Sequence, residues 1–138
     1  MELNTKIDIV VPYVNGNDPE WLKIYEKYTN DDDIHNKAVR FDGNDILKYV
    51  FRSIELYLPW INNIHLLVMM DSQVPEWVNR EEIHIVYHND FIPEHLLPVF
   101  NSTAIEMFLW DIPDLSEQFI YINDDMIFNQ LLRPDDFF

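Results

Sequence analysis

The sequence predicts an α/β fold in which helices cover a largely parallel sheet. Short apolar runs typical of strands alternate with segments that carry helical periodicity, and this alternation is characteristic of layered α/β domains. The runs are IDIVVPYV (7–14), NIHLLVMM (63–70), IHIVYH (83–88) and QFIYIN (118–123). The unbroken apolar letters in IVV and FIYI are typical of central strands that are covered on both faces. No repeat or linker interrupts the pattern, so one domain is expected over residues 1–138.

Three segments between these runs are expected to be helices. The first follows Asn44 or Asp45, either of which can cap it, and ends at Pro59. Its apolar stripe consists of Leu47, Val50, Phe51, Ile54 and Leu58. A second helix is expected over NSTAIEMFLWDIP (101–113), with a stripe of Ile105, Phe108, Leu109 and Ile112. The amphipathic segment PEWLKIYEKY (19–28) predicts a third helix, followed by an exposed loop at 29–37.

The composition excludes several classes of function. The chain of 138 residues has 25 acidic and 9 basic residues, a net charge of −16, which would repel nucleic acid and anionic membranes. It has no cysteine for a disulfide, a thiolate metal site or a nucleophile, and its two glycines form no glycine-rich phosphate loop. The N-terminus lacks the apolar core of a secretory signal, and the run LLVMM at 66–70 is too short to span a bilayer. A cytoplasmic location is therefore expected.

Asp124 and Asp125 are the first candidates for chemistry. They follow the run FIYI directly, and ligands of open α/β sheets bind beyond the carboxyl ends of the strands. If the strand continued, Asn123 and Asp125 would face one side and Asp124 the other. A carboxylate there would suit Mg²⁺ or Mn²⁺, which take oxygen ligands from protein, phosphate and water. The alternative is that Asn-Asp-Asp only forms a turn, and the pattern alone favours neither.

Glu106 also has two interpretations. Thr103-Ala-Ile-Glu106 fits a capping box, in which the glutamate bonds back to the first residue of its helix. This structural interpretation is the one that the pattern favours. In the functional alternative, the carboxylate faces the same crevice as Asp125 and serves as a general base or a second metal ligand. The histidines have no metal-ligand spacing; His65 and His84 are expected to be structural, while His88 and His95 are candidates to line a cleft.

Several blocks of the chain, taken together and in order, resemble the Stealth proteins. IDIVVPYVNGNDPEW (7–21) resembles their opening block, and RFDGNDILKYVFRSIELYLPWINNIHLLV (40–68) resembles their second. QVPEWVN continues that likeness, and HNDFIPEHLLPVFNSTAIEMFLWDIPDLSEQFIYINDDMIF (88–128) resembles the third. The fold that this resemblance implies is a layered, Rossmann-like nucleotide-sugar transferase domain.

The resemblance implies a phosphotransferase. A sugar hydroxyl would attack the β-phosphate of a nucleotide sugar, so that a phosphodiester forms in capsular or exopolysaccharide synthesis and a nucleoside monophosphate leaves. The partners implied are a nucleotide-sugar donor and a saccharide acceptor. Matched by motif, Glu106 and Asp125 would be catalytic, with Asp124 and Asp125 as metal ligands. The positions that would bind substrate are Asn15, Gly16, Asp18, Arg40, Asn44, Asp45, Arg52, Asn101 and Ser102.

Some positions depart from the family pattern. Pro12-Tyr13 stands where relatives have an aromatic residue and a tryptophan, and VMMDSQ places Met69 and Ser72 where they have threonine and glycine. Relatives also carry a fourth, C-terminal block with a functional histidine and arginine, and this sequence ends at RPDDFF. We therefore expect a domain that is incomplete at its C-terminus, lacks part of the catalytic set, and exposes apolar surface that favours self-association. The alternatives are a metal-dependent glycosyltransferase and a non-catalytic nucleotide-sugar-binding module.

Overall fold

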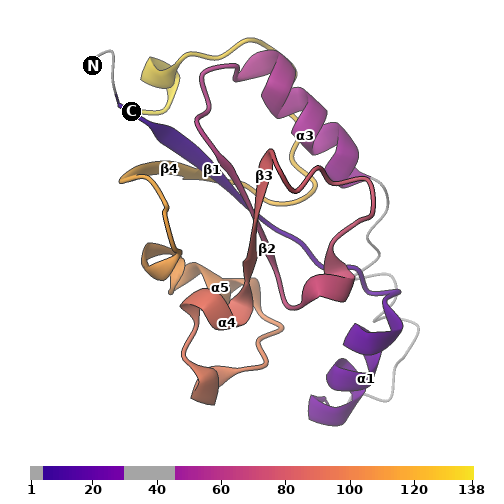
Figure 1. The fold of residues 1–138 in the computed structure, drawn as a ribbon. Helices are drawn as coiled ribbons and strands as arrows, with labels where there is room; N and C mark the ends of the chain where they lie inside the picture. The colour runs from indigo at the N-terminus through magenta and orange to yellow at the C-terminus, as the bar shows by residue number, and fades with distance from the viewer. Residues whose placement is uncertain (1–4, 30–45) are drawn as a thin grey trace.

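A computed structural model of the chain describes residues 5–29 and 46–138. Its centre is a sheet of four parallel strands in the order β3-β2-β1-β4. The strands are β1 (Ile7–Pro12), β2 (Ile64–Val68), β3 (Ile83–Tyr87) and β4 (Gln118–Tyr121). All four coincide with the predicted apolar runs, and the predicted parallel α/β fold is confirmed (Figure 1). Each strand ends one or two residues before its predicted end, at Pro12, Val68, Tyr87 and Tyr121.

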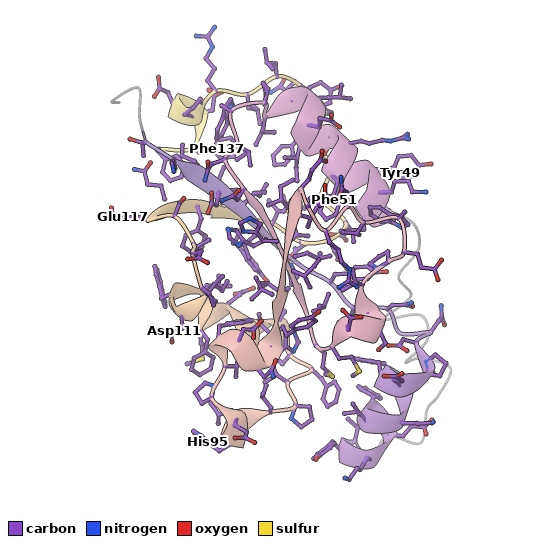
Figure 2. All side chains as sticks on the ribbon, in the orientation of Figure 1. Tyr49, Phe51, His95, Asp111, Glu117 and Phe137 are labelled. Carbon is purple, nitrogen blue, oxygen red and sulfur yellow. The ribbon has the colours of Figure 1, made fainter. Side chains whose placement is uncertain are left out.

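Helices and turns cover both faces of this sheet (Figure 1). On one face lies α3 (Ile46–Tyr57), whose buried Leu47, Val50 and Ile54 pack against alternate residues of β1 and β2. In Figure 2, Phe51 of this helix points toward the sheet, whereas Tyr49 points away from it and is 54% exposed. The stripe predicted for this helix is therefore its buried face. The predicted caps, Asn44 and Asp45, lie outside the described residues.

The opposite face is covered by short elements instead of one long helix. They are α4 (His88–Phe91), η2 (Glu94–Leu96), α5 (Ser102–Glu106) and η3 (Leu109–Asp111). Their buried residues form a second core with Val10, Leu67 and Val86 of the sheet. Away from these elements, α1 (Pro19–Tyr28) follows β1 and coincides with its predicted range.

The prediction of one continuous helix over 101–113 is wrong. The chain is helical only as α5 and then turns at Phe108, whose φ and ψ of −115° and 11° lie outside the α region, before the 3₁₀ turn η3. Ile105, Leu109 and Ile112 are nevertheless buried in the same core. The apolar spacing predicts which side chains are buried. It does not predict whether one helix or two short helical pieces bury them.

The capping box predicted for Thr103 and Glu106 is also wrong. Asn101 is the N-cap of α5, and its side-chain oxygen accepts a hydrogen bond from Thr103 N at 2.9 Å. With Asn101 as the N-cap in place of Thr103, Glu106 is the last residue of α5 and is exposed. Its carboxylate is therefore too far along the helix to cap the first turn.

The central position predicted for FIYI is wrong as well. β1 lies in the interior of the sheet as expected, but β4 is the outer strand beside it among the described residues. Phe119 and Tyr121 pack against one core, whereas Ile120 and Ile122 pack against the other. The apolar run therefore reflects two covered faces and does not require a neighbouring strand on each side.

After β4 the chain crosses back over α3 (Figure 1). Phe128 N donates to Ser53 Oγ at 3.1 Å, and Leu132 N donates to Tyr57 O at 3.1 Å. The indole of Trp60 donates to Leu132 O at 2.8 Å. These bonds fix the segment that leaves the Asp124–Asp125 turn.

Candidate functional site

The site lies where the strand order of the sheet changes direction. β2 pairs with one side of β1, and β4 pairs with the other, with Val10 opposite Tyr121. Since all strands are parallel, the segments that follow β1 and β4 leave the sheet at the same edge. In open α/β sheets, this switch point is where ligands bind. The topology thus brings the Asn15–Asp18 loop and the Asp124–Asp125 turn to neighbouring positions.

Asp124 and Asp125 occupy a tight turn. Met126 N donates to Asn123 O at 3.2 Å, which closes the turn around the two acids. β4 ends at Tyr121, so the alternation expected for Asn123, Asp124 and Asp125 in an extended strand does not hold. Asp124 is half-buried and Asp125 exposed. Burial, together with the negative charge of Asp125, raises the pKa of the Asp124 carboxyl. A cation bound at this turn would offset that repulsion.

Tyr121 lies near both Glu106 and Asp124. Burial raises the pKa of the Tyr121 hydroxyl to about 12, and the negative charges of Glu106 and Asp124 contribute to the same shift. The tyrosine therefore lies within electrostatic reach of both carboxylates. We call Glu106, Tyr121, Asp124 and Asp125 the acidic crevice, a name that denotes these four side chains and not a cavity. The sequence patterns give no signal for Tyr121, although it stands within the FIYINDD block.

The β1 side of the edge is tightly hydrogen-bonded. The Asp18 side chain is buried and accepts hydrogen bonds from Glu20 N at 3.1 Å, Ser72 Oγ at 2.6 Å and Gln73 Nε2 at 2.8 Å. Burial by itself would raise the pKa of Asp18, but these hydrogen bonds outweigh it and lower the pKa. Asp18 is thus the N-cap of α1, which favours a structural role for its carboxylate.

Asn15 and Gly16 precede Asp18 in this loop. The Asn15 side chain accepts a hydrogen bond from Asn17 N at 3.0 Å, and Gly16 is buried. Ser72 and Gln73 hold this loop, although the sequence marked only Ser72, as a departure from the family pattern. Sequence reasoning missed their role because they lie more than fifty residues further along the chain.

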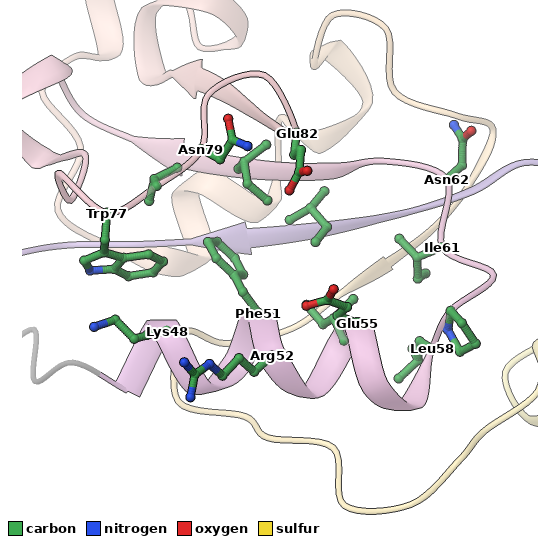
Figure 3. A pocket seen from close by; sticks show the side chains of 15 residues that line it. Lys48, Phe51, Arg52, Glu55, Leu58, Ile61, Asn62, Trp77, Asn79 and Glu82 are labelled. Atoms are coloured by element: carbon green, nitrogen blue, oxygen red, sulfur yellow. The ribbon is translucent and has the colours of Figure 1, made fainter.

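The remaining predicted residues are divided between the two faces. Asn101 and Ser102 are exposed at the start of α5, on the same face as Tyr121. Arg52 instead lines a groove of about 540 Å³ between α3 and the segment before β3, opposite Asn79 and Glu82 (Figure 3). No residue of the acidic crevice lines this groove. Arg40, Asn44 and Asp45 lie outside the described residues.

The two histidines considered for a cleft lie in different environments. His88 is buried at the start of α4, and burial lowers its pKa to about 4. His95 is exposed in η2, on the rim of the molecule (Figure 2). His65 is structural as expected, since its Nε2 lies 2.9 Å from the carboxylate of the equally buried Asp8.

A metal ion at the acidic crevice would be coordinated by few protein ligands. Within residues 5–29 and 46–138, no three histidine, aspartate or glutamate side chains are grouped so as to hold an ion. Asp124 and Asp125 together offer two carboxylates, and Mg²⁺ sites commonly combine one or two carboxylates with substrate phosphate and water. In the same described ranges, no helix has the length and apolar character needed to cross a membrane.

Comparison with known proteins supplies the family. The family described as Stealth protein CR2, conserved region 2, matches residues 40–138. The exopolysaccharide phosphotransferase cps2G of Lactiplantibacillus plantarum is 41% identical over 134 residues, which cover 96% of this chain and 39% of that protein. The capsular polysaccharide phosphotransferase WcwK of Streptococcus pneumoniae is 40% identical over 136 residues, 96% of this chain and 41% of the relative.

A third relative aligns with more of its own length. The capsular polysaccharide phosphotransferase CpsJ of Streptococcus thermophilus is 39% identical over 142 residues, which cover 96% of this chain and 57% of the relative. The chain thus spans between 39% and 57% of the length of these three proteins. With the family match covering most of its residues, the chain belongs to the Stealth protein family.

Proposed function

We propose that this chain forms part of a phosphotransferase that moves a sugar-1-phosphate from a nucleotide sugar to a saccharide hydroxyl. The product would be a phosphodiester in a capsular or exopolysaccharide. The names of its relatives support a phosphotransferase, and the acidic crevice at the switch point of the sheet is the observation that carries the proposal. A cytoplasmic location and self-association stay predictions.

The proposed reaction is an in-line displacement at phosphorus. An acceptor hydroxyl oxygen bonds to the β-phosphorus, the bond from that phosphorus to the bridging oxygen breaks, and a nucleoside monophosphate leaves. We assign Glu106 as the base that takes the hydroxyl proton, because it is exposed and near Tyr121. The Tyr121 hydroxyl stays neutral at pH 7 and can donate a hydrogen bond within the crevice.

Asp124 and Asp125 would hold Mg²⁺ or Mn²⁺ in this scheme. Such an ion neutralises charge on the diphosphate and on the leaving phosphate. Two considerations support the assignment: both acids lie in one turn, and the pKa of Asp124 is raised by the charge of its neighbour. Their oxygens are also the ligand type that these cations prefer.

Substrate contacts are proposed for the two sides of the crevice. Asn15 and Gly16 follow β1 and would meet the nucleotide end of the donor, while Asn101 and Ser102 lie at the start of α5. Asp18 would act through its hydrogen bonds to the loop instead of touching the donor. The proposal that Arg52 binds donor phosphate has less support, because its groove includes none of the crevice residues.

The test is Asp125→Asn in the full-length protein, with Asp111→Asn as a matched control. Both aspartates are exposed, but Asp111 lies in η3 on the rim of the molecule (Figure 2). The purified proteins are incubated with nucleotide-sugar donors, a saccharide acceptor and Mg²⁺ or Mn²⁺, and the released nucleotide is identified. We expect Asp125→Asn to lose monophosphate release by about 100-fold or more, as removal of charge stabilisation at a transition state does, and Asp111→Asn to retain it.

Other outcomes identify the alternatives. Release of a nucleoside diphosphate from a UDP-sugar would indicate a glycosyltransferase. Donor binding without turnover would indicate a binding module. Full activity of Asp125→Asn would overturn the assignment of that residue, even if monophosphate is released.

A further inference from the structure

Gln73 connects two loops at the edge of the sheet that carries the acidic crevice. It is the last residue of the 3₁₀ turn η1 (Asp71–Gln73), which follows β2, and only 1% of its side chain is exposed. Its Oε1 accepts a hydrogen bond from Asn15 N at 2.7 Å, and its Nε2 donates to Asn15 O at 3.1 Å. The same Nε2 donates to Asp18 Oδ2 at 2.8 Å. We call these three hydrogen bonds the Gln73 clamp.

The clamp requires the chemistry of an uncharged carboxamide. One end must accept a hydrogen bond while the other donates two, and a carboxylate cannot donate when ionised. The main-chain N–H and C=O of Asn15 are both held by the same side chain, so the backbone at Asn15 is fixed on both sides. Buried polar groups paired in this way are costly to remove because their partners are left without hydrogen bonds.

Ser72 reinforces the clamp from the neighbouring position. Its hydroxyl donates to Asp18 Oδ2 at 2.6 Å, on the same carboxylate oxygen that Gln73 contacts. Ser72 stands where the family pattern noted above has glycine, which has no side chain for this bond. This chain therefore fixes the loop more firmly than the clamp alone would.

We propose that Gln73 is a positioning residue that holds the Asn15–Asp18 loop in the conformation that binds the nucleotide-sugar donor, with Ser72 in a supporting role. This inference rests on the proposed function. The loop follows β1 at the switch point of the sheet, next to the strand that leads to Asp124 and Asp125. A loop fixed before the ligand arrives avoids the cost of ordering it on binding, so the clamp contributes to donor affinity.

The experiment compares Gln73→Glu, Gln73→Leu and Ser72→Gly with the parent in the full-length protein. Gln73→Glu keeps the size and the acceptor for Asn15 N but loses both donated bonds and faces Asp18 with a second carboxylate. Gln73→Leu removes all three bonds at similar volume. Ser72→Gly removes one bond of an exposed residue, so it tests the idea with little risk to folding. Trp60→Phe is the matched control, because it removes one side-chain bond to a main-chain carbonyl on the α3 face.

Two measurements are made on each variant. Amide hydrogen exchange reports protection of residues 13–18, and steady-state kinetics report kcat and KM for donor and acceptor separately. We expect both Gln73 variants to lose protection in this segment and to raise the donor KM by about tenfold or more, with kcat and the acceptor KM changed much less. Ser72→Gly should show the same pattern at smaller size, and Trp60→Phe should leave the donor KM and the protection of the segment unchanged.

Contrary results separate the two proposals. Unchanged protection of residues 13–18 in the Gln73 variants and in Ser72→Gly would overturn the clamp as a positioning device. If an active variant loses protection of residues 13–18 but keeps the donor KM of the parent, the link between the clamp and donor binding is overturned. A variant in which kcat falls while both KM values stay unchanged would overturn that link as well. A parent that releases no nucleoside monophosphate would overturn the proposed function, and the exchange measurement would still decide whether Gln73 holds the loop.

Discussion

Replacement of Asp8 by alanine tests how much one buried carboxylate contributes to this fold. Asp8 lies on β1, and its side chain is fully buried. Its Oδ1 accepts hydrogen bonds from Asn62 Nδ2 at 3.0 Å and Asn63 N at 3.1 Å. Its Oδ2 accepts from Ser116 N at 3.0 Å and lies 2.9 Å from His65 Nε2. The carboxylate thereby joins β1 to β2 and to the loops that precede β2 and β4.

The expected loss follows from the donors that the substitution leaves unpaired. A buried donor without a partner costs about 1–3 kcal/mol. Asn62 is exposed and can turn its amide to water, so the cost comes from the two main-chain amides and His65. Three unpaired donors would together cost about 3 kcal/mol even at the low end of that range. We therefore expect Asp8→Ala to lower the free energy of unfolding by about 3–5 kcal/mol, a large share of the about 5–15 kcal/mol of a typical domain.

The assay is chemical denaturation at pH 7, followed by circular dichroism, of the parent, Asp8→Ala and Asp111→Ala. The exposed Asp111 serves as a control and should leave the midpoint unchanged. A loss below about 1 kcal/mol for Asp8→Ala would refute the reasoning, because it would show that the donors find other partners or water.

The pH dependence provides a second check on Asp8. Burial alone would raise its pKa, but the hydrogen bonds from His65, Ser116 and Asn62 outweigh burial and lower the pKa below 3.8. A carboxyl with a lowered pKa in the folded state adds stability above its ordinary pKa, and this stability is lost as the pH falls through the folded value. The parent should therefore lose stability below about pH 4 more steeply than Asp8→Ala does. Equal slopes would contradict this assignment.

Two further predictions concern groups near the second core. Burial lowers the pKa of His88 from 6.5 to about 4. As the pH drops from 6.5 to 4, His88 therefore takes up a proton in the unfolded chain before it does so in the folded one, and the free energy of unfolding should fall. NMR titration should give a midpoint for His88 near 4, and a midpoint near 6.5 would contradict its burial as the neutral form. Glu106→Gln removes a negative charge beside Tyr121, so the pKa of the Tyr121 hydroxyl should fall from about 12 toward 10. NMR titration of Tyr121 measures this pKa, and Glu117→Gln is the control. An unchanged pKa in Glu106→Gln would show that Glu106 does not face the tyrosine.

Local features of this fold could be predicted from the sequence because they depend on neighbouring residues. The amphipathic segment 19–28 became α1 with the predicted bounds, and each apolar run became a strand. The break in the helix after Glu106 could not be predicted, because residues 105, 109 and 112 keep helical spacing on both sides of it. Burial periodicity alone does not distinguish one helix from two short pieces that cover the same core.

The candidate site was predicted in part for the same reason. The position of Asp124 and Asp125 beyond a strand end was visible in the chain, and so was the place of Asn15 after β1. The partners of Asp18 were not, because Ser72 and Gln73 are 54 and 55 residues away and meet it only when β2 pairs with β1. Sequence patterns identified the polar residues at this edge, but only the folded chain shows that Asp18 is committed to internal hydrogen bonds.

The pairing of β1 with β4 sets the order in which the site forms. The hydrogen bond from Ser116 N to Asp8 joins residues 108 positions apart, so it closes a long loop of chain. Contacts of such long range form late in folding, because the entropy of closing the loop is lost before they stabilise anything. During synthesis, the Asn15–Asp18 loop can meet Ser72 and Gln73 well before the acidic turn has left the ribosome. The two sides of the crevice therefore come together only once β4 has paired with β1, which delays any binding at this edge until the sheet can hold it.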